Sequence, residues 1–183
     1  IPEIEDYDIF NVTLSNYSTK PKNLIAAVLK HQADLGIAFD GDGDRVLMVD
    51  HKGEIFDGDE LIYIIAKSRL ATNSLIGQVV GTLMSNLGME QALKALGIPL
   101  LRAQVGDRYV MEMLTEHQGI LGGENSGHII CLDKTTTGDG IVSALQVLAH
   151  IYQTGKSLHE LKSQMQKYPQ ILINVKVAKK VNP

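Results

Sequence analysis

A short acidic segment between two apolar runs constrains this chain more than any other stretch. Carboxylates occupy alternate positions at Asp40, Asp42 and Asp44, and the residues between them are glycines. The apolar runs 36–39 and 46–49 read as buried strands, so the acids belong to a loop that joins two strands. Alternate positions of an extended segment face the same side, which brings the three carboxylates toward one point.

Three carboxylates held this close repel one another unless a cation lies among them. Glycine at positions 41 and 43 lets the backbone bend so that the acids converge. Oxygen ligands without sulfur or imidazole suit a hard ion, Mg²⁺ or Ca²⁺. The next residue, Arg45, supplies a guanidinium that suits a phosphate bound to the same ion. The segment therefore predicts a divalent-cation site.

Two other loop types, a solvated turn and an EF-hand, have a similar composition. A solvated turn is also rich in Asp and Gly, but three acids at a period of two between buried strands disfavour it. An EF-hand loop opens with Asp-x-Asp-x-Asp and requires glycine at its sixth position and glutamate at its twelfth. Those positions hold Arg45 and His51, and strands flank the loop, so the EF-hand is excluded.

Composition limits the classes of protein to which this chain can belong. With 183 residues, 44% of them hydrophobic, the chain can bury a core in one large domain or two small ones. A net charge of −4 without a basic stripe argues against nucleic acid as a partner. A single cysteine, Cys131, excludes an internal disulfide, and no apolar stretch reaches the roughly 18–20 residues of a membrane span. We expect a cytoplasmic protein without a membrane partner.

Strand and helix signals alternate along the chain, most regularly after residue 56. Short loops separate them, which is typical of α/β proteins with parallel strands. We therefore expect an α/β fold with a mixed, mostly parallel sheet and helices packed on it. The expected strands cover 36–39, 46–50, 54–56, 78–80, 98–105, 119–122, 129–132 and 171–177. The expected helices begin at turn or capping signals, which lie near Pro21, Asp57, Asn86, Asp107, Gly140 and Ser157.

A second loop carries polar side chains at alternate positions. Glu124, Ser126 and His128 follow a predicted strand, so all three can face one cleft at the strand end, where open α/β folds bind ligands. A carboxylate, a hydroxyl and an imidazole can recognise sugar hydroxyls or an amine, although an ordinary glycine-rich turn has the same spacing. Asp107 and Arg108 open a helix at another strand end, which favours anions, and that signal alone is weak.

Three further motifs favour structural roles. The Ser85-Asn86 pair reads as a helix cap, because no histidine or carboxylate is placed nearby to activate the serine. The segment 155–157 imitates the end of a phosphate-binding loop, but His150 replaces the required first glycine. Among the histidines only His128 lies in a convincing site. The helical histidines are expected to be surface or packing residues; they are His31, His117, His150 and His159.

Taken together, five stretches closely resemble the α-D-phosphohexomutases, and among them the phosphoglucosamine mutase branch. The stretches are 34–45 (DLGIAFDGDGDR), 81–86 (GTLMSN), 105–110 (VGDRYV), 123–128 (GENSGH) and 134–140 (KTTTGDG), in the expected order. The resemblance runs from about residue 22 to about residue 177. Asn125 in the fourth stretch, together with the third stretch, points to the glucosamine branch rather than to phosphomannomutase.

The resemblance implies an isomerase that interconverts glucosamine 6-phosphate and glucosamine 1-phosphate through a phosphoserine and a bisphosphate intermediate, feeding cell-wall precursor synthesis. It implies Mg²⁺ as the cofactor and a role for each residue that matches the motifs. The Mg²⁺ ligands would be Asp40, Asp42 and Asp44, and Arg45 would lie beside the transferring phosphoryl group. Sugar hydroxyls would meet Glu124 and Ser126, with His128, Asp107 and Arg108 facing the same cleft.

Two parts of the family pattern are missing. The chain holds neither a phosphoserine loop of the Thr-Ala-Ser-His-Asn-Pro type nor an Arg-x-Ser-Gly-Thr-Glu-Pro loop for the nonreacting phosphate. We therefore expect a central fragment without the nucleophile, inactive alone. Residues 1–56 would be the end of domain 2, 57–168 domain 3, and 169–183 the link toward domain 4. Residues 1–20 match less clearly and fit either an ordered arm or a loose end.

The expected partners are a phosphorylated amino sugar and the missing domains of the same polypeptide. Two alternatives remain open at this point. One is the corresponding fragment of a phosphomannomutase or phosphoglucomutase, which shares the acidic loop. The other is a non-enzymatic module that binds Mg²⁺ or takes part in assembly.

Overall fold

Two sheets form the framework of the computed structural model, which describes residues 21–171 and residue 173. The first sheet is antiparallel, in the order β1 (Leu35–Phe39), β2 (Val46–Asp50) and β3 (Ile55–Phe56). The second has the order β5 (Leu100–Ala103), β4 (Val79–Thr82), β6 (Leu121–Gly123) and β7 (Ile129–Cys131). In it, β4 pairs in parallel with β5 and β6, whereas β7 runs antiparallel to β6. The predicted α/β fold with a mixed, mostly parallel sheet is confirmed.

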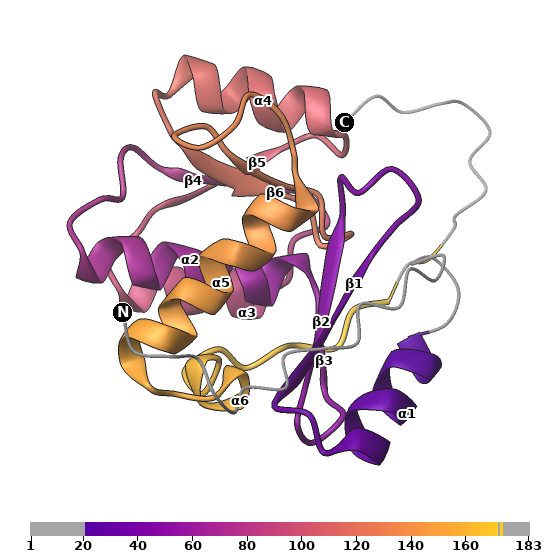
Figure 1. Cartoon of the computed structure of the whole chain (residues 1–183). Coiled ribbons are helices and arrows are strands. Elements are labelled where there is room, and N and C mark those ends of the chain that lie inside the picture. The colour runs from indigo at the N-terminus through magenta and orange to yellow at the C-terminus, as the bar shows by residue number, and fades with distance from the viewer. Residues whose placement is uncertain (1–20, 172, 174–183) are drawn as a thin grey trace.

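Helices cover both faces of the second sheet (Figure 1). One face carries α4, and the other carries α2, α3 and α5, while α1 packs on the first sheet. Their bounds are α1 (Pro21–His31), α2 (Gly58–Ala71), α3 (Leu87–Ala95), α4 (Asp107–Glu116), α5 (Gly140–Thr154) and α6 (Leu158–Leu161). Because α5 contacts β1, β2 and β7, it ties the two sheets together.

The largest hydrophobic cluster is shared by both sheets. Met48 and Phe56 of the first sheet join Val79 and Leu121 of the second in this cluster, and all four are fully buried. The helix α2 runs through its middle, and residues 61–66 expose at most 1% of their surface. A helix buried all round belongs to the interior of a domain rather than to its surface. The two sheets therefore pack as one body.

Most of the expected helices and strands are present, and some are shorter than predicted. Asp57 caps α2 as the signal near this residue predicts, and it forms a capping box with Glu60; Asn86 caps α3. The expected strand over 98–105 is reduced to β5, and it starts only at Leu100 because the Ile98 amide donates to Leu93 at the end of α3 and Pro99 has no amide hydrogen. The strand expected over 171–177 lies outside the described residues, apart from 171 and 173, which are not in a strand.

Candidate active site

The acidic loop, residues 40–45, forms the tip of the β1–β2 hairpin. Its three aspartates each present a carboxylate oxygen within 4.8 Å of the other two. Gly43 has a φ of 75°, a conformation that costs glycine little and other residues more. The carboxylates therefore converge, as the two-residue spacing predicts. The Arg45 amide donates to Asp40 at 3.2 Å, and its guanidinium lies 3.8 Å from the same carboxylate with 45% of the side chain exposed.

The acidic loop contacts the 124–128 loop, which connects β6 to β7. His128 Nδ1 lies 2.9 Å from Asp44 Oδ2, and the His128 side chain is only 7% exposed. Arg45 and His128 form an isolated antiparallel bridge, and the Val46 amide donates to Gly127 at 3.1 Å. The structure thus brings together two segments that lie more than 80 residues apart in the chain. The spacing of motifs along the sequence did not predict this pairing.

The turn that opens α5, residues 138–140, packs against both the acidic loop and the 124–128 loop. The Gly140 amide donates to the Gly43 carbonyl at 2.9 Å. A Cβ atom at position 140 would lie 2.7 Å from the Arg45 carbonyl oxygen, and one at position 138 would lie 2.1 Å from His128 Nε2. Both positions therefore require glycine. The sequence pattern predicted a helix start here and placed residues 134–140 among the stretches that resemble the family, but it did not predict that the glycines on either side of the capping residue Asp139 contact both loops.

Two buried oxygen atoms in this region have no hydrogen-bond partner among the described residues: Asp44 Oδ1 and Ser126 Oγ. A buried polar atom without a partner is costly, and in native proteins a water, an ion or a functional role accounts for it. Glu124, by contrast, is held in place, because its Oε1 accepts the Gly106 amide at 2.9 Å. The three alternating side chains of this loop are therefore held in distinct ways, and Ser126 lacks a partner within the described residues.

The 106–108 turn adjoins the 124–128 loop only through Gly106, as far as the described hydrogen bonds go. Asp107 accepts the amide of Arg108 at 2.7 Å at the start of α4. The Arg108 guanidinium pairs with Glu112 at 2.8 Å, one helical turn further, and its side chain is 80% exposed. This contact points the charge of Arg108 along its own helix rather than onto a residue of either loop. Glu124 is therefore the link between the turn and the rest of the region.

A second group of potential metal ligands lies at the other end of β2. Asp50, Glu54 and His159 also present ligand atoms within 4.8 Å of one another. Here, however, Lys162 Nζ lies 2.9 Å from Glu54, and Lys52 Nζ lies 3.0 Å from His159 Nε2. Asp50 accepts two backbone amides as well as His159, and these bonds lower its pKa although burial alone would raise it.

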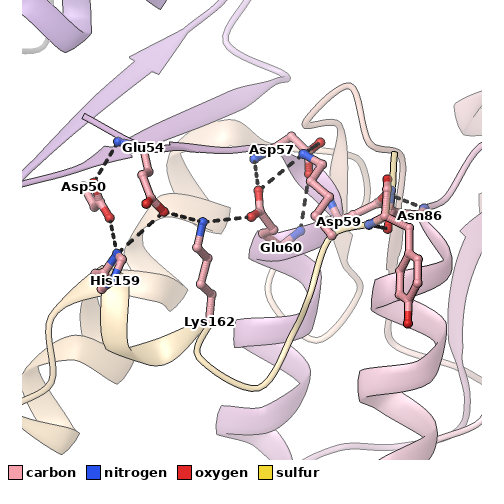
Figure 2. Close-up of polar contacts among 10 residues, drawn as sticks. Asp50, Glu54, Asp57, Asp59, Glu60, Asn86, His159 and Lys162 are labelled. Atoms are coloured by element: carbon pink, nitrogen blue, oxygen red, sulfur yellow. Dashed lines mark hydrogen bonds and ion pairs between the residues drawn. The ribbon is translucent and has the colours of Figure 1, made fainter. Parts of the chain in front are cut away.

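This second group is therefore neutralised by the chain's own cations. Figure 2 shows it as a network of side-chain contacts between the first sheet and the segment after α5. His159, expected to be a surface or packing residue, instead pairs with the buried Asp50 at 2.8 Å. Cys131 is buried in the core, and burial raises its pKa to about 11.

The acidic loop has the properties of a hard-ion site. All of its ligand atoms are carboxylate oxygens, and one of the aspartates has a buried oxygen, Asp44 Oδ1, that lacks a partner in the described part of the chain. Such a donor set fits Mg²⁺, and the exposed guanidinium of Arg45 suits an anion beside it. Within residues 21–171 and 173, no helix is long and apolar enough to cross a lipid bilayer.

Comparison with known proteins identifies the family. The family model described as "Phosphoglucomutase/phosphomannomutase, alpha/beta/alpha domain III" matches residues 57–168, and the domain II model matches residues 5–53. A curated relative from Methylococcus capsulatus named phosphoglucosamine mutase is 65% identical over 165 residues, which are 90% of this chain and 37% of the relative. One of the same name from Alkalilimnicola ehrlichii is 60% identical over 181 residues, 99% of this chain and 40% of the relative.

The chain thus spans about two fifths of the length of these relatives. A crystal structure of a putative phosphomannomutase from Thermus thermophilus has a TM-score of 0.71 and 26% identity. The similarity covers 79% of this chain and 34% of that one. Both the acidic loop and the 124–128 loop lie within the segments that the two domain models match. The chain belongs to the phosphoglucomutase/phosphomannomutase family.

Proposed function

We propose that this chain is the metal- and sugar-binding part of a phosphoglucosamine mutase. The whole enzyme would interconvert glucosamine 6-phosphate and glucosamine 1-phosphate. The name of the relatives that are 60–65% identical supports this reaction. The observation that carries it is the contact between Asp44 and His128, because it joins the acidic loop and the 124–128 loop in one site. A phosphoryl transfer between two positions of a sugar needs both functions side by side.

On the phosphate side, Asp40, Asp42 and Asp44 would hold Mg²⁺. One ligand would be Oδ1 of Asp44, which has no partner in the described part of the chain. When bound, Mg²⁺ would neutralise charge on the phosphoryl oxygens. Arg45 would add a second positive charge beside them, and its exposed guanidinium is available for this role. Phosphoryl transfer depends mainly on positioning and charge stabilisation, which these four side chains can supply.

On the sugar side, Glu124 and Ser126 would bind hydroxyl groups and His128 would line the cleft. Support comes from the Ser126 hydroxyl, which has no partner among the residues that the structure describes, and from the bond that the Gly106 amide donates to the Glu124 carboxylate. His128 bonds to Asp44 and its ring lies directly against the backbone of Gly138, which together define the orientation of the ring. Asp107 and Arg108 would flank the sugar at the start of α4, where the helix end favours anions.

We propose the domain limits that the motifs suggest. Residues 1–56 would complete domain 2, residues 57–168 would form domain 3, and residues 169–183 would lead toward domain 4. The phosphoserine nucleophile and the clamp for the second phosphate would come from other domains of the same polypeptide. A mutase for mannose or glucose phosphates is the second candidate, because the structural match at 26% identity is titled a putative phosphomannomutase.

A comparison of substrates tests the proposal. The full-length polypeptide that contains this chain would be assayed with glucosamine 6-phosphate, mannose 6-phosphate and glucose 6-phosphate, with Mg²⁺ and a hexose bisphosphate activator. We expect the highest kcat/KM with the amino sugar, and no turnover by the 183-residue chain alone.

A preference for mannose or glucose phosphate would replace the proposal by its second candidate. A full-length protein that binds Mg²⁺ but converts none of the three would support a non-enzymatic module instead. Turnover by the 183-residue chain itself would contradict the need for a nucleophile from another domain.

A further inference from the structure

Residues 157–168, here called the strap, cross the molecule from the first sheet to the start of α3. Near its beginning His159 pairs with Asp50 of β2, and near its end the backbone of Tyr168 is bonded to the Asn86 side chain. Gln164 lies between them and accepts bonds from side chains of α2. The strap therefore contacts the first sheet and the helices α2 and α3, and Figure 2 shows the contacts of His159 and Lys162.

The first turn of α2 lies between the strap and the 124–128 loop. On the loop side, the Gly58 amide donates to the Asn125 carbonyl at 3.2 Å. A Cβ atom at position 58 would lie 1.9 Å from the Glu124 carbonyl oxygen, so the loop backbone rests directly on this turn. A shift of the turn must therefore shift the backbone that carries Glu124 and Ser126.

The same turn concentrates negative charge. It contains Asp57, Asp59 and Glu60, of which the last two are almost completely buried. The helix N-terminus and the capping box stabilise part of this charge. Buried carboxylates still require paired cations, because desolvation penalises a charge that is left alone. The described structure supplies these cations from the strap.

Lys162 and Lys167 are the two cations. Lys162 Nζ lies 3.3 Å from Glu60 and 2.9 Å from Glu54, and 4.4 Å from the centre of the Phe56 ring. Lys167 Nζ bonds to Asp57 and lies 3.5 Å from Glu60. Burial lowers the pKa of both lysines, but their carboxylate contacts outweigh it and raise each pKa overall. Both lysines are therefore charged where they meet the turn.

The end of the strap is fixed independently of these ion pairs. Asn86 accepts the Tyr168 amide at 2.9 Å and donates to its carbonyl at 2.8 Å. A Cβ atom at position 88 would lie 2.0 Å from the Gln166 carbonyl, so the strap also passes against the start of α3. Removal of one lysine charge should therefore disturb the turn of α2 without releasing the strap.

We propose that Lys162 and Lys167 are positioning residues that hold the 124–128 loop in place through the first turn of α2. Each neutralises carboxylates of a turn whose glycine supports the loop backbone, and their ion pairs are with that turn and with Glu54 rather than with the loop. The acidic loop has a further support of its own, the bond from Gly140 to Gly43, in addition to its contact with His128. The two lysines should therefore affect the sugar side of the site more than the metal side.

The test compares Lys162→Met and Lys167→Met with Lys94→Met, which removes an exposed lysine of α3. In the full-length polypeptide, amide exchange of residues 121–131 is followed by mass spectrometry. We expect about tenfold faster exchange in the two strap variants and no change in the control, because local opening of the turn exposes these amides. Lys167→Arg keeps the charge and should restore slow exchange. If Lys167→Met does not fold, Lys167→Gln provides the same comparison.

Kinetics give a second readout, which rests on the proposed function. The KM for glucosamine 6-phosphate should rise about tenfold in both strap variants through misplacement of the sugar contacts. The Mg²⁺ concentration for half-maximal activity should stay within about twofold, because the acidic loop has its own support. Equal exchange in strap and control variants, or a change in Mg²⁺ requirement alone, would overturn the inference. A full-length protein without mutase activity would count against the proposed function, and the exchange experiment would still decide this inference.

Discussion

Two groups of carboxylates lie at opposite ends of β2, and the chain treats them differently. The acidic loop precedes the strand, and its three aspartates face one arginine whose guanidinium is 3.8 Å away from Asp40. Asp50 ends the strand and Glu54 follows it, and they contact His159 and Lys162 at 2.8 Å and 2.9 Å, respectively. The first group includes a buried oxygen without a partner in the described structure, whereas both oxygens of Asp50 are bonded.

This difference distinguishes the acidic loop, a candidate metal site, from the group of Asp50 and Glu54, whose ion pairs stabilise the fold. Both groups satisfy a simple distance criterion for metal binding. Within the described residues, only one of them lacks a lysine or arginine at hydrogen-bond distance, and that one also adjoins a second loop with an unpartnered hydroxyl, Ser126. The proximity of acids is therefore less informative than the presence or absence of a cation supplied by the chain.

The largest expected effect is on activity, and it contrasts the two groups directly. Asp42→Asn removes one charge from the acidic loop, and we expect kcat/KM of the full-length polypeptide to fall at least about 100-fold, because charge stabilisation is lost at the phosphoryl group. Glu54→Gln makes the same chemical change in the neutralised group and should leave kcat/KM within about twofold. Steady-state assays measure both values. Equal losses in the two variants would erase the functional distinction between the groups.

An intermediate effect concerns Asp59, which belongs to neither group. Burial raises the pKa of Asp59 from 3.8 to about 6, and its Oδ1 has no hydrogen-bond partner among the described residues. The ionised form is therefore the unfavourable one in the folded state, and stability should rise as the pH falls from above about 6 toward about 4. Asp59→Asn keeps an acceptor for the Asn86 amide, which lies 2.7 Å away, and removes the charge.

We expect Asp59→Asn to stabilise the protein by about 1–3 kcal/mol at about pH 7.5, with the gain disappearing near about pH 4. Urea unfolding at several pH values measures this difference, and other titrating groups cancel in the comparison with the unmodified protein. Asp34→Asn, at an exposed position, is the matched control and should give no pH-dependent difference. A gain that is the same at every pH would show that the carboxylate is not the titrating group.

The smallest expected effect is the binding of Mg²⁺ to the 183-residue chain alone. Mg²⁺ sites commonly combine one or two carboxylates with phosphates of a substrate, so we expect a Kd well above about 1 μM. Calorimetric titration should show that Asp42→Asn weakens this binding further and that Glu54→Gln does not. Sub-micromolar affinity, or binding that depends on Glu54, would show that the group of Asp50 and Glu54 also takes up the ion.

The sequence predicted the features that depend on short spacing. The convergence of the aspartates, the capping box at Asp57 and the cap at Asn86 all follow from short local patterns. The alternation of elements also predicted the mixed sheet, because short loops leave few ways to connect it. The ends of strands were less well predicted. The residues directly after α3 have strand character, but their backbone bonds to the end of the helix.

Features that depend on packing could not be predicted. The contact of Asp44 with His128 joins segments 84 residues apart, and no local pattern reports which loops will meet. The same holds for Lys162 and Lys167, because the sequence around them does not indicate their carboxylate partners at the start of α2. Long-range ion pairs depend on the relative placement of whole elements, and periodicity describes only single elements.

The three glycines that fit against the loops have a consequence for mutational screens. At positions 58, 138 and 140 a single methyl group would meet backbone or ring atoms at 1.9 Å, 2.1 Å and 2.7 Å, respectively. A deep mutational scan of the full-length polypeptide would therefore score these positions as intolerant as the aspartates, although glycine has no side chain to contribute chemistry. Tolerance maps of this family should be read together with backbone distances, so that residues shaping the site are separated from residues that react in it.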